Sequence, residues 1–200
     1  MQLRRTVMFL LVGLIALAPA ALASAAPPDP ALAGLSKLNG HAFDVAFLRM
    51  LIPADDEAIE VAMTATLYAD HPDLLHWNQT FVERDRAQVR QMLAWLAEMG
   101  AQPADRKEGV ATPSVKKMRT LRGAALERAY LSLMSARFDQ DVAVARLAAH
   151  KASQPALRSF AEQIVRVEGQ DSGMLRGWLK KWYQSAGAFP GRSREGRVSD

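Results

Sequence analysis

The second half of this sequence repeats its first half. When the chain is shifted by 83 positions against itself, the two halves align without a gap. Identical residues then coincide at Pro72 and Pro155, at Trp95 and Trp178, at Leu96 and Leu179, and at Ala62 and Ala145. Any two amphipathic hairpins would share apolar positions, but they would not share a proline pair and a tryptophan pair. The sequence therefore predicts two copies of one helical hairpin, which must pack together because one copy cannot bury its own apolar face.

The first residues have the composition of a secretory signal peptide. Arg4 and Arg5 precede an apolar run from Val7 to Leu17, and small residues follow as far as Ala26. This order is typical of a cleaved signal peptide, and the run is shorter than the ~20 apolar residues of a membrane-spanning helix. We therefore expect residues 1–26 to be removed during export to the periplasm or the medium, which would leave no stable membrane span.

Composition excludes several classes of site and partner. The sequence contains no cysteine, which excludes disulfides, thiolate metal sites and a lipid anchor on cysteine. The formal charge of +4 falls to +2 when residues 1–26 are removed, and three of the remaining arginines lie in the last nine residues. The folded part is therefore nearly neutral, and we expect no binding to nucleic acid, which requires clustered basic residues.

Four segments carry the apolar spacing of amphipathic helices. They cover residues 42–69, 72–99, 121–151 and 155–183. We expect the second and fourth to be capped by their own leading residues, which are Asp70 or His71 and Ser153 or Gln154. The predicted four-helix bundle spans residues 41–183, with repeat one at 41–99, a linker at 100–119 and repeat two at 120–183. Residues 27–40 are expected to form a loose lead-in, and residues 184–200 a disordered tail.

The linker indicates how the two hairpins connect. Helices of about 28 residues are near 40 Å long, and a 20-residue linker at about 3.3 Å per residue spans that length. Ferritin-like bundles join two hairpins by such a crossover, whereas an up-and-down bundle needs only short loops. The predicted fold class is therefore all-α, with a ferritin-like four-helix bundle.

Polar residues interrupt the predicted core stripe halfway along three of the helices. With heptad spacing, the second helix places Asp85 and Gln88 inward, and the fourth places Glu168 and Asp171 inward. The third helix adds Arg137 and Asp141 to this predicted polar network. An unpaired carboxylate in a dry core is costly or takes up a proton. Three partners can compensate for it: a metal ion, a cationic side chain or water.

Two sequence stretches resemble a known family. Residues 47–53 read Phe-Leu-Arg-Met-Leu-Ile-Pro, and residues 92–96 read Met-Leu-Ala-Trp-Leu. Over residues 41–183 the chain resembles the secreted, ferritin-like bacterial proteins grouped as domain of unknown function 305. The resemblance implies a metal site, for copper especially, in members that carry Met-Ile-Pro-His-His. This chain has Leu51-Ile52-Pro53-Ala54-Asp55 at that position and Arg137-Phe138 in repeat two, so both histidines are missing.

Two hypotheses follow for the inward carboxylates. In the first, the Arg137 guanidinium has replaced the metal ion and pairs with Asp85, Glu168 or Asp171. In the second, a metal ion remains and binds new ligands. The candidate ligands for this ion are Asp55, Asp56, Asp85, Glu168 and Asp171, with Met50 and Met92 as thioether ligands for copper.

The chain shows no arrangement of residues that supports catalysis. We find no plausible Ser/His/Asp set and no phosphate-binding glycine loop, so we expect no enzymatic activity. The leading prediction is an exported binding or structural protein without a cofactor. The alternative is a periplasmic metal-binding protein, for copper or a hard cation, that uses carboxylates and methionines. A protein partner, a metal ion and a second copy of the chain all remain open as partners.

Overall fold

The structure is a computed structural model that describes residues 30–104 and 111–184. The described part of the chain is all-helical, as predicted, and contains no strand. Its α-helices are α1 (Pro30–Ser36), α2 (Gly40–Thr66), α3 (Pro72–Glu98), α4 (Pro113–Thr120), α5 (Gly123–Lys151) and α6 (Pro155–Leu179), and a short π-helix, η1 (Lys180–Gln184), continues α6. The predicted signal peptide and most of the predicted tail lie outside the described residues.

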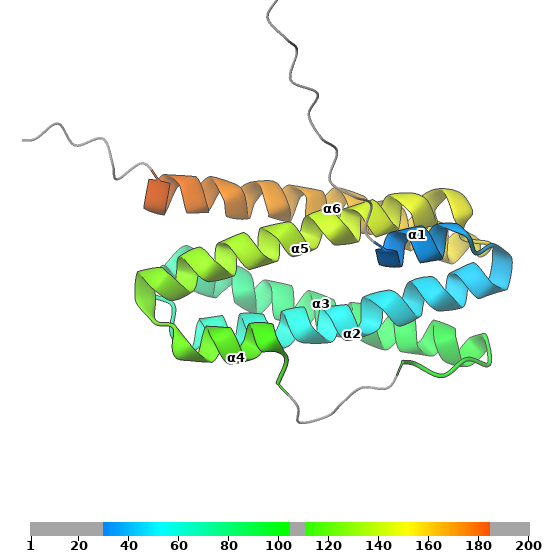
Figure 1. The fold of residues 1–200 in the computed structure, drawn as a ribbon, viewed down its shortest axis with the longest axis horizontal. Coiled ribbons are helices and arrows are strands. Elements are labelled where there is room, and N and C mark those ends of the chain that lie inside the picture. Colours follow the sequence, from blue (N-terminus) through cyan, green and yellow to red (C-terminus); the bar gives the residue numbers. More distant parts are fainter. Residues whose placement is uncertain (1–29, 105–110, 185–200) are drawn as a thin grey trace, which may run out of the picture.

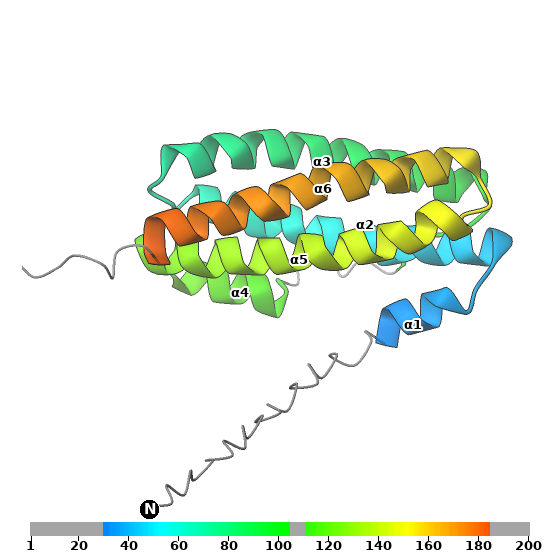
Figure 2. The same cartoon turned by 90° about the horizontal axis from the view of Figure 1, so that it is seen from above.

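The four long helices form a bundle of two antiparallel hairpins, α2 with α3 and α5 with α6 (Figure 1). Helix α3 ends at one end of the bundle, and α5 begins at the other end, so the connection between them crosses the full length (Figures 1 and 2). Helices α3 and α5 therefore run in the same direction. This crossover is the ferritin-like connection that the linker length predicted.

Two short helices lie where the sequence suggested irregular chain. Helix α1 occupies the expected lead-in and buries Leu35, and α4 occupies the expected linker. In α4 the Thr112 hydroxyl caps the helix by accepting a hydrogen bond from the Val115 amide at 3.3 Å. Val115 and Met118 are buried, and α4 packs mainly against α2. The linker therefore contributes to the core in addition to connecting the hairpins.

The buried stripe of α3 departs from the heptad spacing used in the sequence prediction. Val89 and Leu96 are buried, whereas Gln88 and Trp95 are only half-buried. On α6 the buried position is Ser172, and Asp171 beside it is half-buried. A straight α-helix has 3.6 residues per turn, so a strict heptad drifts off the core face by about 20° in each repeat.

The start of α3 is capped by a carboxylate from the other hairpin. Glu127 of α5 is fully buried, and its Oε1 accepts hydrogen bonds from the backbone amides of Asp70 at 2.5 Å and His71 at 2.9 Å. Its Oε2 contacts the His71 ring and the Tyr183 hydroxyl. The N-cap residue of α3 is His71, one of the two that were predicted, but its side chain makes no capping hydrogen bond, and Glu127 binds the amides of Asp70 and His71 instead.

The start of α6 is capped in the same way by a carboxylate of the first hairpin. Asp44 of α2 is fully buried and accepts hydrogen bonds from the backbone amides of Ser153 at 2.8 Å and Gln154 at 3.3 Å. Asp44 and Glu127 are 83 residues apart, and so are the amides that they bind. Each hairpin therefore caps the second helix of the other one.

Among the helices of residues 30–104 and 111–184, none is apolar over a sufficient length to cross a lipid bilayer.

Candidate functional site: a buried cluster of carboxylates and guanidinium groups

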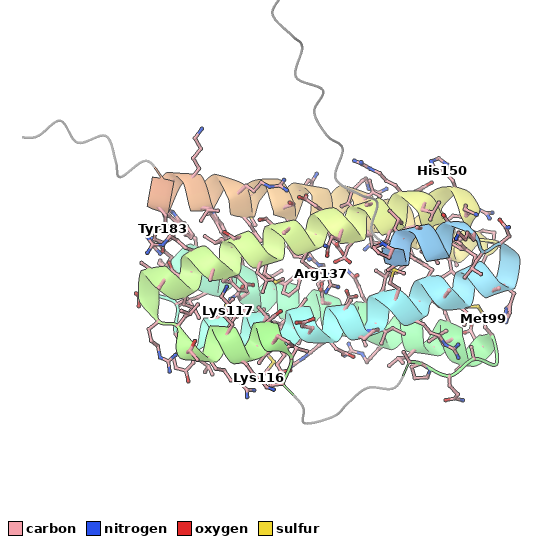
Figure 3. The ribbon with its side chains drawn as sticks, in the orientation of Figure 1. Met99, Lys116, Lys117, Arg137, His150 and Tyr183 are labelled. Atoms are coloured by element: carbon pink, nitrogen blue, oxygen red, sulfur yellow. The ribbon has the colours of Figure 1, made fainter. Side chains whose placement is uncertain are left out.

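Charged side chains from all four long helices meet halfway along the bundle, where Figure 3 places Arg137 near the middle of α5. Helix α2 contributes one carboxylate, α3 one carboxylate and one guanidinium, α5 one of each, and α6 two carboxylates. In chain order these residues are Asp55, Arg84, Asp85, Arg137, Asp141, Glu168 and Asp171. We call this set the central cluster.

Arg137 makes three hydrogen bonds, one within α5 and two that join α5 to α2. Its Nε donates to Asp141 Oδ2 at 2.6 Å, its Nη1 to the Ala54 carbonyl at 2.7 Å, and its Nη2 to Asp55 Oδ1 at 3.3 Å. The side chain is only 15% exposed. The expected pairing of Arg137 with Asp85, Glu168 or Asp171 is wrong in its partners, because the guanidinium makes its hydrogen bonds to Asp141 of its own helix and to Ala54 and Asp55 of α2.

Arg84 pairs with two of the acids that were assigned to Arg137. Its Nε donates to Asp85 Oδ1 at 3.2 Å, and its Nη1 lies 2.8 Å from Asp171 Oδ2. The indole Nε1 of Trp77 also donates to Asp171 Oδ1 at 3.4 Å. Sequence analysis missed Arg84 because it lies beside the predicted stripe. Its position directly before Asp85 was the available signal, since a long arginine side chain extends its charged end well away from its own backbone.

Glu168 has no cationic partner at hydrogen-bonding distance among the described residues. It is 5% exposed, and no donor reaches its Oε2. Its strongest charge interactions are repulsions from Asp141 and Asp55, and the attraction of Arg137 is weaker. The remaining residue of the predicted network, Gln88, is half-buried and makes none of the hydrogen bonds of the central cluster.

Burial raises the pKa values of the carboxyl groups in the central cluster. Burial and the neighbouring aspartates raise the pKa of Glu168 well above its usual value, and the same causes raise that of Asp55. Burial raises the pKa of Asp85 to about 7, although the nearby Arg84 opposes the change. Burial also raises the pKa of Asp141 against the attraction of Arg137. The surroundings of these carboxyl groups therefore disfavour their charged forms.

The candidate metal ligands do not converge on an ion site. Within residues 30–104 and 111–184, no three His, Asp or Glu side chains are placed to hold a metal ion together. Met92 is fully buried and belongs to the hydrophobic core, and Met50 is half-buried against the core. Asp56 is half-buried beside the central cluster. The residues present fit a guanidinium at the centre and do not fit a metal ion, so we assign no metal ligands there.

A partly open cavity of about 260 Å³ lies beside Arg137. Its wall is formed by Ala58 and Val61 of α2 and by Leu133, Met134 and Ala136 of α5, and its polar lining by Glu57, Ser114, Arg137 and Gln140. Small side chains at the contact of α2 and α5 leave this space unfilled. The cavity gives water access to one side of the Arg137 guanidinium.

A second buried polar contact lies closer to the α2–α3 turn. The Tyr130 hydroxyl donates to Asn78 Oδ1 at 2.6 Å, and Asn78 Nδ2 donates to the Ala62 carbonyl at 3.3 Å and to the Thr66 hydroxyl at 3.1 Å. All the polar atoms of the Asn78 side chain are therefore paired. This contact connects α2, α3 and α5 without charge, and it explains a buried asparagine on the predicted stripe.

Several solved structures have a similar fold. CopM in its Cu(I)-bound form matches with a TM-score of 0.63 and 18% identity, over 70% of this chain and 97% of CopM. A DUF305 protein from Streptomyces coelicolor, inferred to be secreted, matches with a TM-score of 0.63 and 19% identity, over 69% of this chain and 92% of that protein. A DUF305 fragment from Deinococcus radiodurans matches with a TM-score of 0.62 and 22% identity, over 69% and 95%. CopM has also been solved with Cu(II) and with silver.

The sequence comparison agrees with the structural one. No curated protein matches this sequence. The family described as Domain of unknown function (DUF305) matches residues 20–96 and 130–197, which is well over half of the chain and covers both hairpins. By this match, the chain is a member of the DUF305 family.

Proposed function

We propose that this protein is an exported, non-enzymatic helical bundle, with a binding or structural role, in which Arg137 occupies the place of a metal ion. The observation that carries the proposal is the position of the Arg137 guanidinium. It donates to Asp141, and also to the Ala54 carbonyl and to Asp55, which occupy the two positions where the family resemblance would place histidines. A fixed positive charge thus satisfies acids that would otherwise need an ion.

Export is supported by the leader-like composition of residues 1–26 and by the similarity to a protein inferred to be secreted. The absence of catalysis is supported by the site itself. Its acids are paired with arginine or buried, and the cavity beside Arg137 is lined mainly by apolar side chains. We therefore assign no reaction to the chain.

The test is the metal content of the protein after export in a bacterial host. We expect no stoichiometric metal in the purified protein. We also expect no heat of binding when micromolar protein is titrated with Cu(II), Ag(I), Mn²⁺ or Ca²⁺. One ion per chain that a chelator removes would overturn the proposal.

A second candidate function is metal binding, and the similarity to CopM favours it. The structures of CopM with copper and silver establish those ions for CopM alone. For this chain, metal binding would need ligands other than the central cluster, since no set of three is in place among the described residues. The titrations above separate the two functions directly.

A gain-of-function variant tests the place of Arg137 more sharply. Replacing Ala54 and Asp55 with histidine, together with Arg137→Ala, would restore the family pattern in repeat one and remove the resident cation. We expect this variant to bind copper and the parent protein not to bind it. A matched control is Arg146→His, which adds one exposed histidine to the same helix as Arg137. A folded triple variant that binds no more copper than the control would contradict the assignment of this position.

A further inference from the structure

The centre of the bundle holds more acids than bases. The carboxyl groups of the central cluster are Asp55, Asp85, Asp141, Glu168 and Asp171, and its guanidinium groups are Arg84 and Arg137. If all seven were ionised, three negative charges would have no cation among these groups. Charges in a dry interior are neutralised unless they are paired. The charge that the two arginines leave over must therefore be neutralised by protons or solvated by water.

Glu168 is the clearest excess charge. It lies on the inward face of α6, is 5% exposed, and has an Oε2 that no donor reaches. The groups that act on it are aspartates from the three other long helices and the Arg137 guanidinium, which Asp141 and Asp55 already hold. A proton on the Glu168 carboxyl removes this repulsion and turns one of its oxygens into a hydrogen-bond donor.

We infer that the centre of the bundle is a proton-binding site, in which Glu168 and at least one of Asp55 and Asp85 hold a proton in the folded protein at neutral pH. The ligand is the proton itself, and its removal weakens the packing of the two hairpins. The inference rests on the proposed function in one respect, since it takes the central cluster to hold no metal ion.

The groups that face Glu168 and Asp85 determine the sign of the effect. From α2 these groups are Asp55 and, acting on it, Asp56; from α3, Arg84; from α5, Arg137, Asp141 and the buried Tyr130; and from α6, Asp171, which shares Arg84 with Asp85. Burial outweighs the two arginines, so the pKa values of Glu168 and Asp85 are raised on folding. A carboxyl group whose pKa is raised on folding stabilises the fold at pH values below the pKa that it has in the unfolded chain. This stabilisation is lost as the pH rises through the pKa of the folded state. For Asp85 this pH interval extends from its usual pKa of 3.8 to about 7, and for Glu168 it extends above its usual pKa.

The first measurement uses the unmodified protein. In the infrared spectrum at neutral pH, we expect the carbonyl stretch of protonated carboxyl groups, which is separate from the carboxylate bands. We also expect the melting temperature to fall by roughly 10 °C between about pH 5 and about pH 8. The absence of the carbonyl band, or a melting temperature that rises over this interval, would overturn the inference.

Substitutions then show which carboxyl groups hold the protons. Glu168→Gln imitates the protonated side chain, so it should remove part of the carbonyl band and raise the melting temperature at about pH 8 relative to the parent protein. Asp85→Asn provides a second, independent variant and should act in the same direction. The matched control is Glu162→Gln on the exposed face of α6, which should change neither quantity. If both inward variants keep the full band and the full pH dependence, the protons reside elsewhere and the inference is wrong.

Melting with and without added metal ions distinguishes a proton from a metal cation as the ligand of the central cluster. Chelator-treated protein is melted at about pH 8 with and without Mn²⁺ and Ca²⁺. We expect the melting temperature to stay the same. A rise that Glu168→Gln abolishes would show that the central cluster takes a cation, which would overturn this inference and the proposed function together. Loss of the carbonyl band without any metal effect would overturn this inference alone.

Discussion

Arg137→Met is the substitution that tests the central cluster most directly. Methionine keeps much of the length and the apolar stem of arginine, but it removes the donors to Asp141, to Asp55 and to the Ala54 carbonyl. The substitution therefore leaves two buried carboxyl groups without a cation, and little volume is lost. The stability change then reports on charge and hydrogen bonding much more than on packing.

The structure allows a rough magnitude for this loss. Removing one partner of a buried ion pair costs about 3–5 kcal/mol. We expect the lower end, about 3 kcal/mol at neutral pH, because Asp55 and Asp141 can take up protons in place of the lost cation. For a protein of this size, 1 kcal/mol shifts the melting temperature by about 2–4 °C, so the expected decrease is roughly 6–12 °C.

Thermal and urea denaturation followed by circular dichroism would measure the loss. The control is Arg146→Met, an exposed arginine on the same helix, which should shift the melting temperature by less than about 2 °C. At about pH 5 the loss should be smaller, because both carboxyl groups are then more easily protonated. A melting temperature for Arg137→Met equal to that of the control would refute the structural role of the guanidinium.

Three further predictions concern the caps and the uncharged core contact. Glu127→Gln and Asp44→Asn should each lower the free energy of unfolding by about 2 kcal/mol. Hydrogen exchange should become faster at the start of α3 in the first variant and at the start of α6 in the second. Exchange rates equal to those of the parent protein at both helix starts would contradict the caps. Several hydrogen bonds outweigh the effect of burial and lower the pKa of Glu127. Its contribution to the free energy of unfolding should therefore be present above its usual pKa and disappear in acid, which is opposite to Glu168. Denaturation of Glu127→Gln and of the parent protein at several pH values checks this. Tyr130→Phe should lower the free energy of unfolding, measured by urea denaturation, by about 1–2 kcal/mol, because it leaves the side-chain oxygen of Asn78 unpaired. An unchanged urea midpoint would show that water replaces the hydroxyl.

Much of the fold follows from local sequence patterns. Helix type and approximate bounds follow from apolar spacing, from the prolines that begin α3 and α6, and from a linker long enough to cross the bundle. The ends of α2 differ from prediction by two or three residues. Helix α4 was missed because its two buried residues, Val115 and Met118, are too few to produce a periodic pattern.

The candidate site was harder to predict than the fold. The sequence identified the carboxylates that lie inside, but it could not assign their partners, because a heptad count fixes neither the rotation of each helix nor the direction of a long side chain. Arg84 lies off the heptad stripe and still reaches Asp85 and Asp171. The capping carboxylates were missed because each contact joins residues more than 50 positions apart.

The contact between Arg137 and the Ala54 carbonyl also limits how alike the two hairpins can be. In the sequence alignment by 83 positions these two residues coincide, and Arg137 Nη1 donates to the Ala54 carbonyl at 2.7 Å. A small residue at position 54 leaves room for this contact. A second arginine there would instead bring another positive charge close to the Arg137 guanidinium. The two aligned positions can therefore share one guanidinium but cannot hold two.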